Sequence, residues 1–171
     1  MPTPGKAEFE QVVRAYATDL FRYLYWLCRD RAQAEDLVQE VFARAWAAWA
    51  EQRDEKAVKA WLYTIARNEH ARLYERKRLE IDDEADLDSL VAANADPALA
   101  LDLRKAFGLL PASLRDPLLL QVLGGLSSAE IAAAAELTVE AVDMRLSRAR
   151  KALRALIEGA PDSNRKPKAR P

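Results

Sequence analysis

Apolar residues recur every three or four positions along most of this 171-residue chain, a spacing that is typical of amphipathic helices. The pattern predicts helices over residues 7–28 and 57–78, and between them a helix that Asp30 caps, with Gln33 three positions on. Glycine is scarce, whereas alanine, leucine, arginine and glutamate dominate, which favours helix over strand. The chain is therefore predicted to be all-α, with these three helices closing into one small domain.

The C-terminal third has the start signals of a short helix followed by a long one. Ser127 and Glu130 have the spacing of a capping box, which predicts a helix over residues 129–135. After a tight turn, Thr138 can cap a helix that continues to about residue 159.

Two further helices are expected ahead of this pair, one over residues 98–107 and one that ends near residue 123, before two glycines. Pro117 lies inside the second of them. That helix is therefore expected either to begin late, with Asp116 as its cap, or to be kinked.

Charge is unevenly distributed along the chain, although the formal net charge is only −1. Residues 79–103 include acidic and no basic side chains, whereas basic residues cluster just before them and again near the C-terminus. Because the acidic stretch has weak periodicity, we expect it to connect two small helical domains. The expected organisation is a domain at 1–78, an acidic linker at 79–96, a second domain at 97–159 and a disordered basic tail at 160–171.

A short helix, a turn of about three residues and a longer helix with basic residues form the plan of a helix-turn-helix. The second helix would enter the major groove of DNA, where Arg145, Arg148 and Arg150 could reach phosphates or base edges. A plain helical hairpin with a solvated, arginine-rich face would have the same pattern, because basic helices are common. These residues alone leave both interpretations open.

Side chains that could perform chemistry are not grouped in the sequence. The single cysteine, Cys28, excludes an internal disulfide and a cysteine-cluster metal site. No Ser/His/Asp set, phosphate-binding glycine loop or carboxylate pair stands out, so we expect no enzymatic activity, cofactor, metal ion or small-molecule substrate. Since no apolar run approaches the roughly 18 residues of a membrane span and the first residues lack a signal-peptide pattern, a cytoplasmic protein is expected.

Four segments of the chain resemble the sigma factors of bacterial RNA polymerase. Residues 126–132 (LSSAEIA) and 142–153 (VDMRLSRARKAL) resemble sigma region 4. Residues 34–46 (AEDLVQEVFARAW) look like the polymerase-binding helix of region 2, and residues 61–68 (WLYTIARN) look like the helix that handles the −10 promoter element. Two such domains in this order, without a region 3, resemble the extracytoplasmic-function (ECF) sigma factors.

The resemblance implies a protein that binds core RNA polymerase, directs transcription initiation at promoters with −10 and −35 elements, and is held by an anti-sigma factor. The residues that would dock on core polymerase are Asp36, Gln39, Glu40 and Arg44. Those that would contact the −10 element are Gln52, Asn68, Arg72, Arg76, Lys77 and Arg78. Those that would contact the −35 element are Thr138, Asp143, Met144, Arg145 and Arg148.

The final helix and the turn before it depart from the family pattern. Glu136 stands where glycine is common, and a left-handed backbone there would cost about 1 kcal/mol. Asp143 and Met144 replace a basic residue and a serine, and an aspartate would repel phosphates while it could accept a hydrogen bond from cytosine. We therefore expect Arg145 and Arg148 to make most of the contacts of this helix.

Several alternatives remain open on the residues alone. The polar residues at 36–44 could simply be solvated rather than bind a partner. The acidic linker could be a flexible, solubilising tether, or it could pass through the basic channels of the polymerase. The loop at 51–57 departs from the aromatic pattern that is frequent there, whereas Trp46, Trp49 and Trp61 fall on apolar stripes, which favours a place in the core over base stacking. The competing functions are a helix-turn-helix transcriptional regulator and a sigma-like interaction module that reads DNA weakly.

Overall fold

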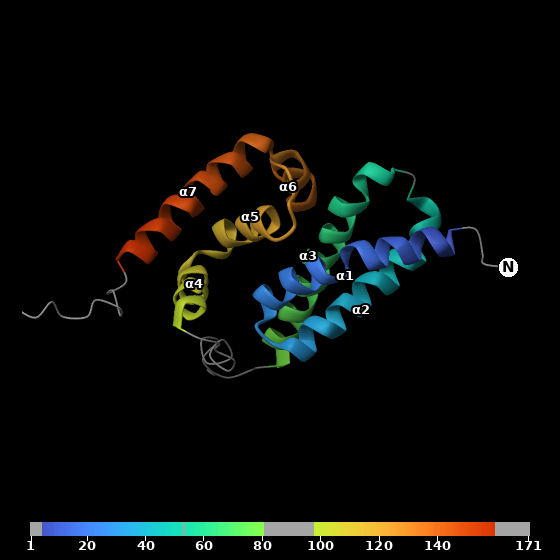
Figure 1. Ribbon diagram of the computed structural model, residues 1–171, viewed down its shortest axis with the longest axis horizontal. Helices are drawn as coiled ribbons and strands as arrows, with labels where there is room; N and C mark the ends of the chain where they lie inside the picture. The colour runs from blue at the N-terminus through green and yellow to red at the C-terminus, as the bar shows by residue number, and fades with distance from the viewer. Residues whose placement is uncertain (1–4, 53, 81–97, 160–171) are drawn as a thin grey trace, which may run out of the picture.

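The computed structural model describes residues 5–52, 54–80 and 98–159, and over these residues the chain is helical without strands (Figure 1), as predicted. The acidic linker beyond residue 80 and the tail at 160–171 lie outside the described residues. The helices are α1 (Lys6–Cys28), α2 (Arg31–Ala47), η1 (Trp49–Glu51), η2 (Glu55–Ala57), α3 (Val58–Glu80), α4 (Ala98–Leu109), α5 (Ala112–Val122), α6 (Ser128–Ala135) and α7 (Val139–Glu158).

The first three helices pack on one another as a bundle around a shared apolar core. The α2 helix starts where the sequence predicts, because the Asp30 carboxylate accepts a hydrogen bond from the backbone N–H of Gln33 at 3.0 Å. The α3 helix continues to Glu80, two residues beyond the end expected from the apolar pattern. The side chains of each helix that fill the core are Leu20 and Leu24, then Leu37 and Val41, then Leu62 and Ala66.

The C-terminal helices α4 to α7 form a second packed group in which α5 lies against α7. The expectation that α5 begins late at Asp116 is wrong, since the helix begins at Ala112 after Pro111 and continues through Pro117. Four consecutive side chains from Pro117 onward are buried. Burial of each leucine among them contributes about 1.5–3 kcal/mol, which offsets the backbone hydrogen bond that proline cannot make.

Two glycines after α5 allow the second group of helices to lie against the first. Gly125 has a φ of 61°, and its N–H donates to the carbonyl of Gln121 four positions back, as in an αL cap. A Cβ on Gly124 would lie 2.6 Å from the carbonyl oxygen of Leu120 and 3.1 Å from the ring of Tyr63 in α3. A side chain at position 124 would therefore clash with the backbone at the end of α5 and press against Tyr63 of the first domain.

The two domains share a continuous buried core and lie side by side (Figure 1). The contacts run from α5 and α6 of the second domain to α1 and α3 of the first. At the other end of the junction the rings of Trp26 and Phe107 meet edge to face at 5.2 Å. None of the helices that the structure describes is long and apolar enough to cross a membrane.

Candidate nucleic-acid and protein interfaces

Three local features define the ends of the two helices in the helix-turn-helix: a capping box, a left-handed residue and an N-cap. The Ser127 hydroxyl accepts from the N–H of Glu130, and the Glu130 carboxylate accepts from the N–H of Ser127 at 2.7 Å, which completes the predicted capping box. Glu136 ends α6 in the left-handed conformation, with a φ of 55°, as the turn requires. Thr138 then caps α7 by accepting from the N–H of Ala141 at 3.1 Å. The predicted start and turn signals are all confirmed.

The residues expected to contact the −35 element lie at the cap and in the N-terminal half of α7. Arg145 is half-buried, whereas Thr138, Met144 and Arg148 are exposed. Asp143 is also exposed, but its carboxylate accepts a hydrogen bond from the Ser128 hydroxyl at 2.6 Å. That bond ties α7 to the start of α6, so Asp143 has a structural partner that the sequence did not indicate. Arg150, by contrast, is turned toward Gln121 of α5.

The residues expected to dock on core polymerase form the polar side of α2. The buried side chains of this helix, among them Leu37 and Val41, face the bundle, and the polar side chains flank them toward solvent and toward α3. The four exposed docking residues are Asp36, Gln39, Glu40 and Arg44. Their predicted place on a polar flank is therefore confirmed, while their role in docking stays a prediction.

The residues expected to contact the −10 element are only partly described. Asn68, Arg72 and Arg76 are exposed on α3 at four-residue intervals, which places them in one row. Gln52 is half-buried, and its side-chain oxygen accepts from the N–H of Asp54 at 3.3 Å, so it shapes the loop before α3. Lys77 and Arg78 belong to α3, but their side chains lie outside the described residues.

The three tryptophans that fall on apolar stripes, Trp46, Trp49 and Trp61, differ in burial. Trp49 and Trp61 pack against the core, as expected. Trp46 keeps 43% of its surface exposed, although its ring lies 5.1 Å from that of Phe9. The expectation of a core position is therefore wrong for Trp46, which packs against Phe9 at the edge of the core.

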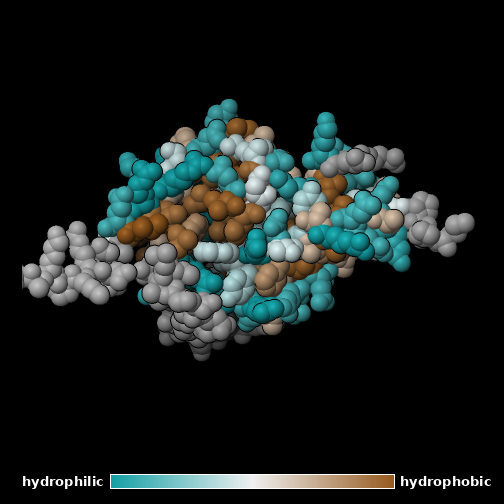
Figure 2. Space-filling view, viewed as in Figure 1, coloured by the Kyte–Doolittle hydropathy of each residue, from teal (hydrophilic) through white to brown (hydrophobic). Residues whose placement is uncertain are grey.

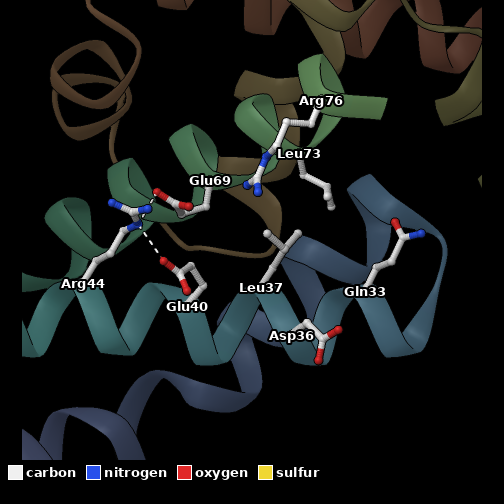
Figure 3. Close-up of a pocket in the computed structure, with 8 residues that line it drawn as sticks. All are labelled: Gln33, Asp36, Leu37, Glu40, Arg44, Glu69, Leu73 and Arg76. Carbon is white, nitrogen blue, oxygen red and sulfur yellow. Dashed lines mark ion pairs between the residues drawn. The ribbon is translucent and has the colours of Figure 1, made fainter. Parts of the chain in front are cut away.

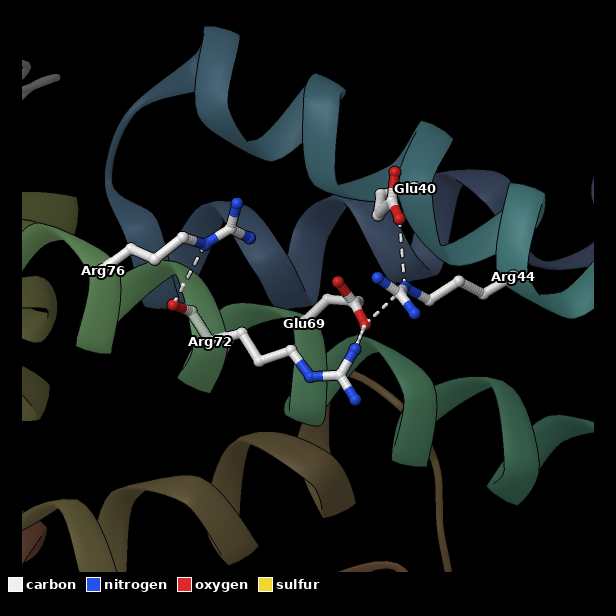
Figure 4. A network of polar contacts seen from close by, with 5 residues as sticks. All are labelled: Glu40, Arg44, Glu69, Arg72 and Arg76. Carbon is white, nitrogen blue, oxygen red and sulfur yellow. Dashed lines mark hydrogen bonds and ion pairs between the residues drawn. The ribbon is translucent and has the colours of Figure 1, made fainter.

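A buried carboxylate that sequence analysis did not identify joins α2 and α3 of the first domain. The Glu69 side chain is only 3% exposed, and its Oε1 atom lies 2.6 Å from Arg44 Nε and 2.9 Å from Arg72 (Figure 4). Arg44 also pairs with Glu40 at 3.0 Å. A signal was present in the sequence, because position 69 continues the inward register of Leu62, Ala66 and Leu73 on α3. A glutamate in that register requires partners.

A hollow of about 300 Å³ opens beside this carboxylate between α2 and α3 (Figure 3). Its walls bring together side chains expected to bind polymerase, such as Asp36 and Glu40, and one expected to bind DNA, Arg76. The two expected interfaces of the first domain thus meet along one groove. Among the described residues, no cluster of His, Cys, Asp or Glu side chains could hold a metal ion.

Asp116 stands at the junction of the two domains. Its carboxylate accepts a hydrogen bond from the Tyr23 hydroxyl at 2.7 Å and one from Arg67 Nε at 2.5 Å. Burial, with the negative charge of Asp116 next in importance, raises the pKa of Tyr23 well above its ordinary value. Burial, the largest single influence, lowers the pKa of Arg67, but the hydrogen bond to Asp116 and the negative charge of Asp116 together outweigh it, so the pKa of Arg67 is raised.

A second tyrosine beside this junction is buried without a hydrogen-bond partner for its hydroxyl, namely Tyr63. Its ring meets that of Tyr23 edge to face at 5.3 Å, and its burial raises its pKa. Next to it, Lys59 of α3 donates to the carbonyl oxygen of Gly125 at 3.0 Å. The α3 face that carries Lys59, Tyr63 and Arg67 is therefore covered by the second domain.

The surface of the second domain keeps large apolar side chains exposed, including Leu103 and Leu109 of α4 and Ile157 of α7. Figure 2 shows apolar surface gathered over α5 and the C-terminal end of α7. Apolar patches of this kind are typical of contact sites for other proteins.

Both domains match known sequence families. The family described as Sigma-70 region 2 matches residues 12–80, and that described as Sigma-70, region 4 matches residues 100–153. The ECF RNA polymerase sigma factor EcfG of Rhodopseudomonas palustris is 34% identical over 137 residues, which cover 76% of this chain and 75% of that protein. The ECF RNA polymerase sigma factor SigM of Bacillus subtilis is 29% identical over 153 residues, which cover 86% of this chain and 93% of that protein.

A solved structure is similar across both domains. It is the sigma factor RpoE of Bartonella quintana, crystallised in complex with the anti-sigma factor NepR. The two chains superimpose with a TM-score of 0.75 and 28% sequence identity, over 90% of this chain and 99% of that one.

Proposed function

The chain belongs to the ECF family of RNA polymerase sigma factors, and we propose how its two domains divide the work of promoter-directed transcription initiation. The observation that carries the role of the first domain is the groove between α2 and α3, where the polar residues of one helix meet the basic row of the other. In the proposal, α2 docks on core RNA polymerase through Asp36, Gln39, Glu40 and Arg44. The polymerase performs the chemistry, and this chain supplies promoter specificity in the cytoplasm.

The −10 element is bound by the row on α3. Residues four positions apart are separated by about 6 Å along a helix, so Asn68, Arg72 and Arg76 would follow one strand of DNA. The arginines would neutralise phosphates, and the amide of Asn68 would hydrogen-bond a base edge. Lys77 and Arg78 would extend the basic track, while Gln52 would act from the loop ahead of α3.

The −35 element is bound by α7 in the major groove, with α6 bracing it from behind. Arg145 and Arg148 would make the main contacts, and Thr138 and Met144 would lie beside the base edges. Asp143, one of whose oxygens is held by Ser128, would use the other to accept from a cytosine amino group.

An anti-sigma factor is proposed as the second protein partner. The similar RpoE chain was crystallised with the anti-sigma factor NepR, and this chain shares the arrangement of the two domains of RpoE. The apolar surface over α5 and α7 is the face that such a partner would cover.

Run-off transcription with core polymerase tests the proposal. We expect transcripts from promoters with matching −10 and −35 elements only when both this chain and core polymerase are present. Asp36→Arg, which reverses a charge on the docking face, should reduce transcription by weakening polymerase binding. DNA binding without initiation would instead indicate a helix-turn-helix regulator, and polymerase binding without promoter preference would indicate an interaction module.

A further inference from the structure

Glu69 is a charged side chain in a place that an apolar one could fill. It lies in the inward register of α3 and is almost fully buried, and a buried ion pair adds little net stability over a well-packed apolar residue. Its effect is therefore mainly geometric. The carboxylate holds in place the groups that neutralise it.

The two arginines that neutralise Glu69 belong to different faces of the domain. Arg44 comes from the α2 face proposed to dock on polymerase, and Arg72 comes from the α3 row proposed to bind the −10 strand. Both pair with the same oxygen atom of Glu69, at 2.6 Å and 2.9 Å. Because they share one acceptor, a shift of either guanidinium changes the position that is favourable for the other.

The same network extends in both directions from Glu69 (Figure 4). On the α2 side Arg44 also pairs with Glu40 at 3.0 Å. On the α3 side the backbone carbonyl of Arg72 accepts a hydrogen bond from Arg76 Nε at 3.5 Å. The arginine side chains stay 46% and 54% exposed, so each keeps part of its guanidinium available to a partner while Glu69 holds the rest.

We propose that Glu69 is a positioning residue that couples the polymerase-binding face to the −10-binding face through Arg44 and Arg72. When core polymerase fixes Arg44, the shared carboxylate is fixed as well, and Arg72 is held ready for a phosphate. The inference rests on the proposed function, because it assigns Glu69 a role through the two faces named there.

A double-mutant cycle in polymerase binding tests the first half of the coupling. The affinity of full-length protein for core polymerase is measured by fluorescence anisotropy for wild type, Glu69→Gln, Arg44→Ala and the double variant. Glu69→Gln should weaken binding roughly tenfold when Arg44 is present, as expected for residues in direct contact, and less than about twofold when it is absent. Equal losses in both backgrounds would mean that Glu69 acts on the fold in general, and would overturn the proposal.

The second half of the coupling, from Arg44 to Arg72, is measured as DNA binding by the holoenzyme, with all of this protein bound to core polymerase. Binding of the holoenzyme to a forked −10 promoter DNA is compared for wild type and Arg44→Ala, each with and without Arg72→Ala. Arg44→Ala should weaken DNA binding about threefold or more while Arg72 is present and have no further effect without it. This cycle leaves Glu69 unchanged, so it remains decisive even if Glu69→Gln does not fold. An Arg44→Ala effect that persists without Arg72 refutes the coupling.

Two variants control for charge and folding. Glu69→Asp keeps the carboxylate and should recover part of the affinity that Glu69→Gln loses. Glu75→Gln removes the same charge from an exposed position of α3 and should leave both affinities within about twofold of wild type. If wild type binds polymerase and supports promoter-dependent transcription but both cycles are additive, only the coupling fails. If wild type does neither, the proposed function fails with it.

Discussion

Replacing Asp116 with alanine removes the carboxylate that joins the two domains, and its cost follows from the two donors left behind. The Tyr23 hydroxyl is fully buried, so losing its acceptor costs about 1–3 kcal/mol. The Arg67 side chain is 37% exposed and regains water, so its share is at most about 1 kcal/mol. Together the two shares come to about 1–4 kcal/mol, and the midpoint of about 2.5 kcal/mol corresponds to roughly 5–10 °C in Tm for a protein of this size.

Thermal and urea unfolding followed by circular dichroism measure this loss, with Glu10→Ala on the exposed side of α1 as the control. Tyr23→Phe is made alone and together with Asp116→Ala. If the hydrogen bond contributes as argued, the double variant loses about 1 kcal/mol less than the sum of the single variants. An Asp116→Ala Tm within about 1 °C of the control, or strictly additive losses, would refute the reasoning.

Three further outcomes are expected. Since burial raises the pKa of Tyr23 and Tyr63 above their ordinary value of 10.0, the folded protein keeps both protonated when the unfolded chain has begun to ionise. Their contribution to the free energy of unfolding should therefore be constant below about pH 9, and the free energy of unfolding should fall as the pH rises through about 10, with a smaller fall in Tyr23→Phe. Glu136→Gly should raise the Tm by about 1–4 °C in calorimetry, because relief of the left-handed strain exceeds the entropy cost of glycine, and a lower Tm would contradict the strain. Arg145→Ala with Arg148→Ala should reduce run-off transcription from a −35-dependent promoter roughly tenfold or more while leaving core polymerase affinity intact, and unchanged promoter use would show that other residues read the element.

The helices and their ends follow from signals that act within about one turn of the chain. Asp30, the Ser127–Glu130 pair and Thr138 each accept from a backbone N–H three residues away, so a reader of the sequence can place α2, α6 and α7 from those residues alone. The match to two sigma regions is also readable from the sequence alone, because it depends on the order of residues within each segment. The left-handed turn at Glu136 was likewise predictable from its place between two capped helices.

Tertiary structure alone decided what Glu69 and Asp116 do. A carboxylate in the chain has no local mark that distinguishes a helix cap from a tertiary partner, and Asp116 was a reasonable cap beside Pro117. It became a junction residue because packing brings Tyr23, 93 positions away, and Arg67, 49 positions away, within hydrogen-bonding distance. Burial then made each of these charges dependent on its neighbours, since an uncompensated charge in the core is costly. The sequence therefore determines which helices form and to which family the chain belongs. The packed fold decides that Asp116 joins the two domains and that Glu69 joins α2 to α3.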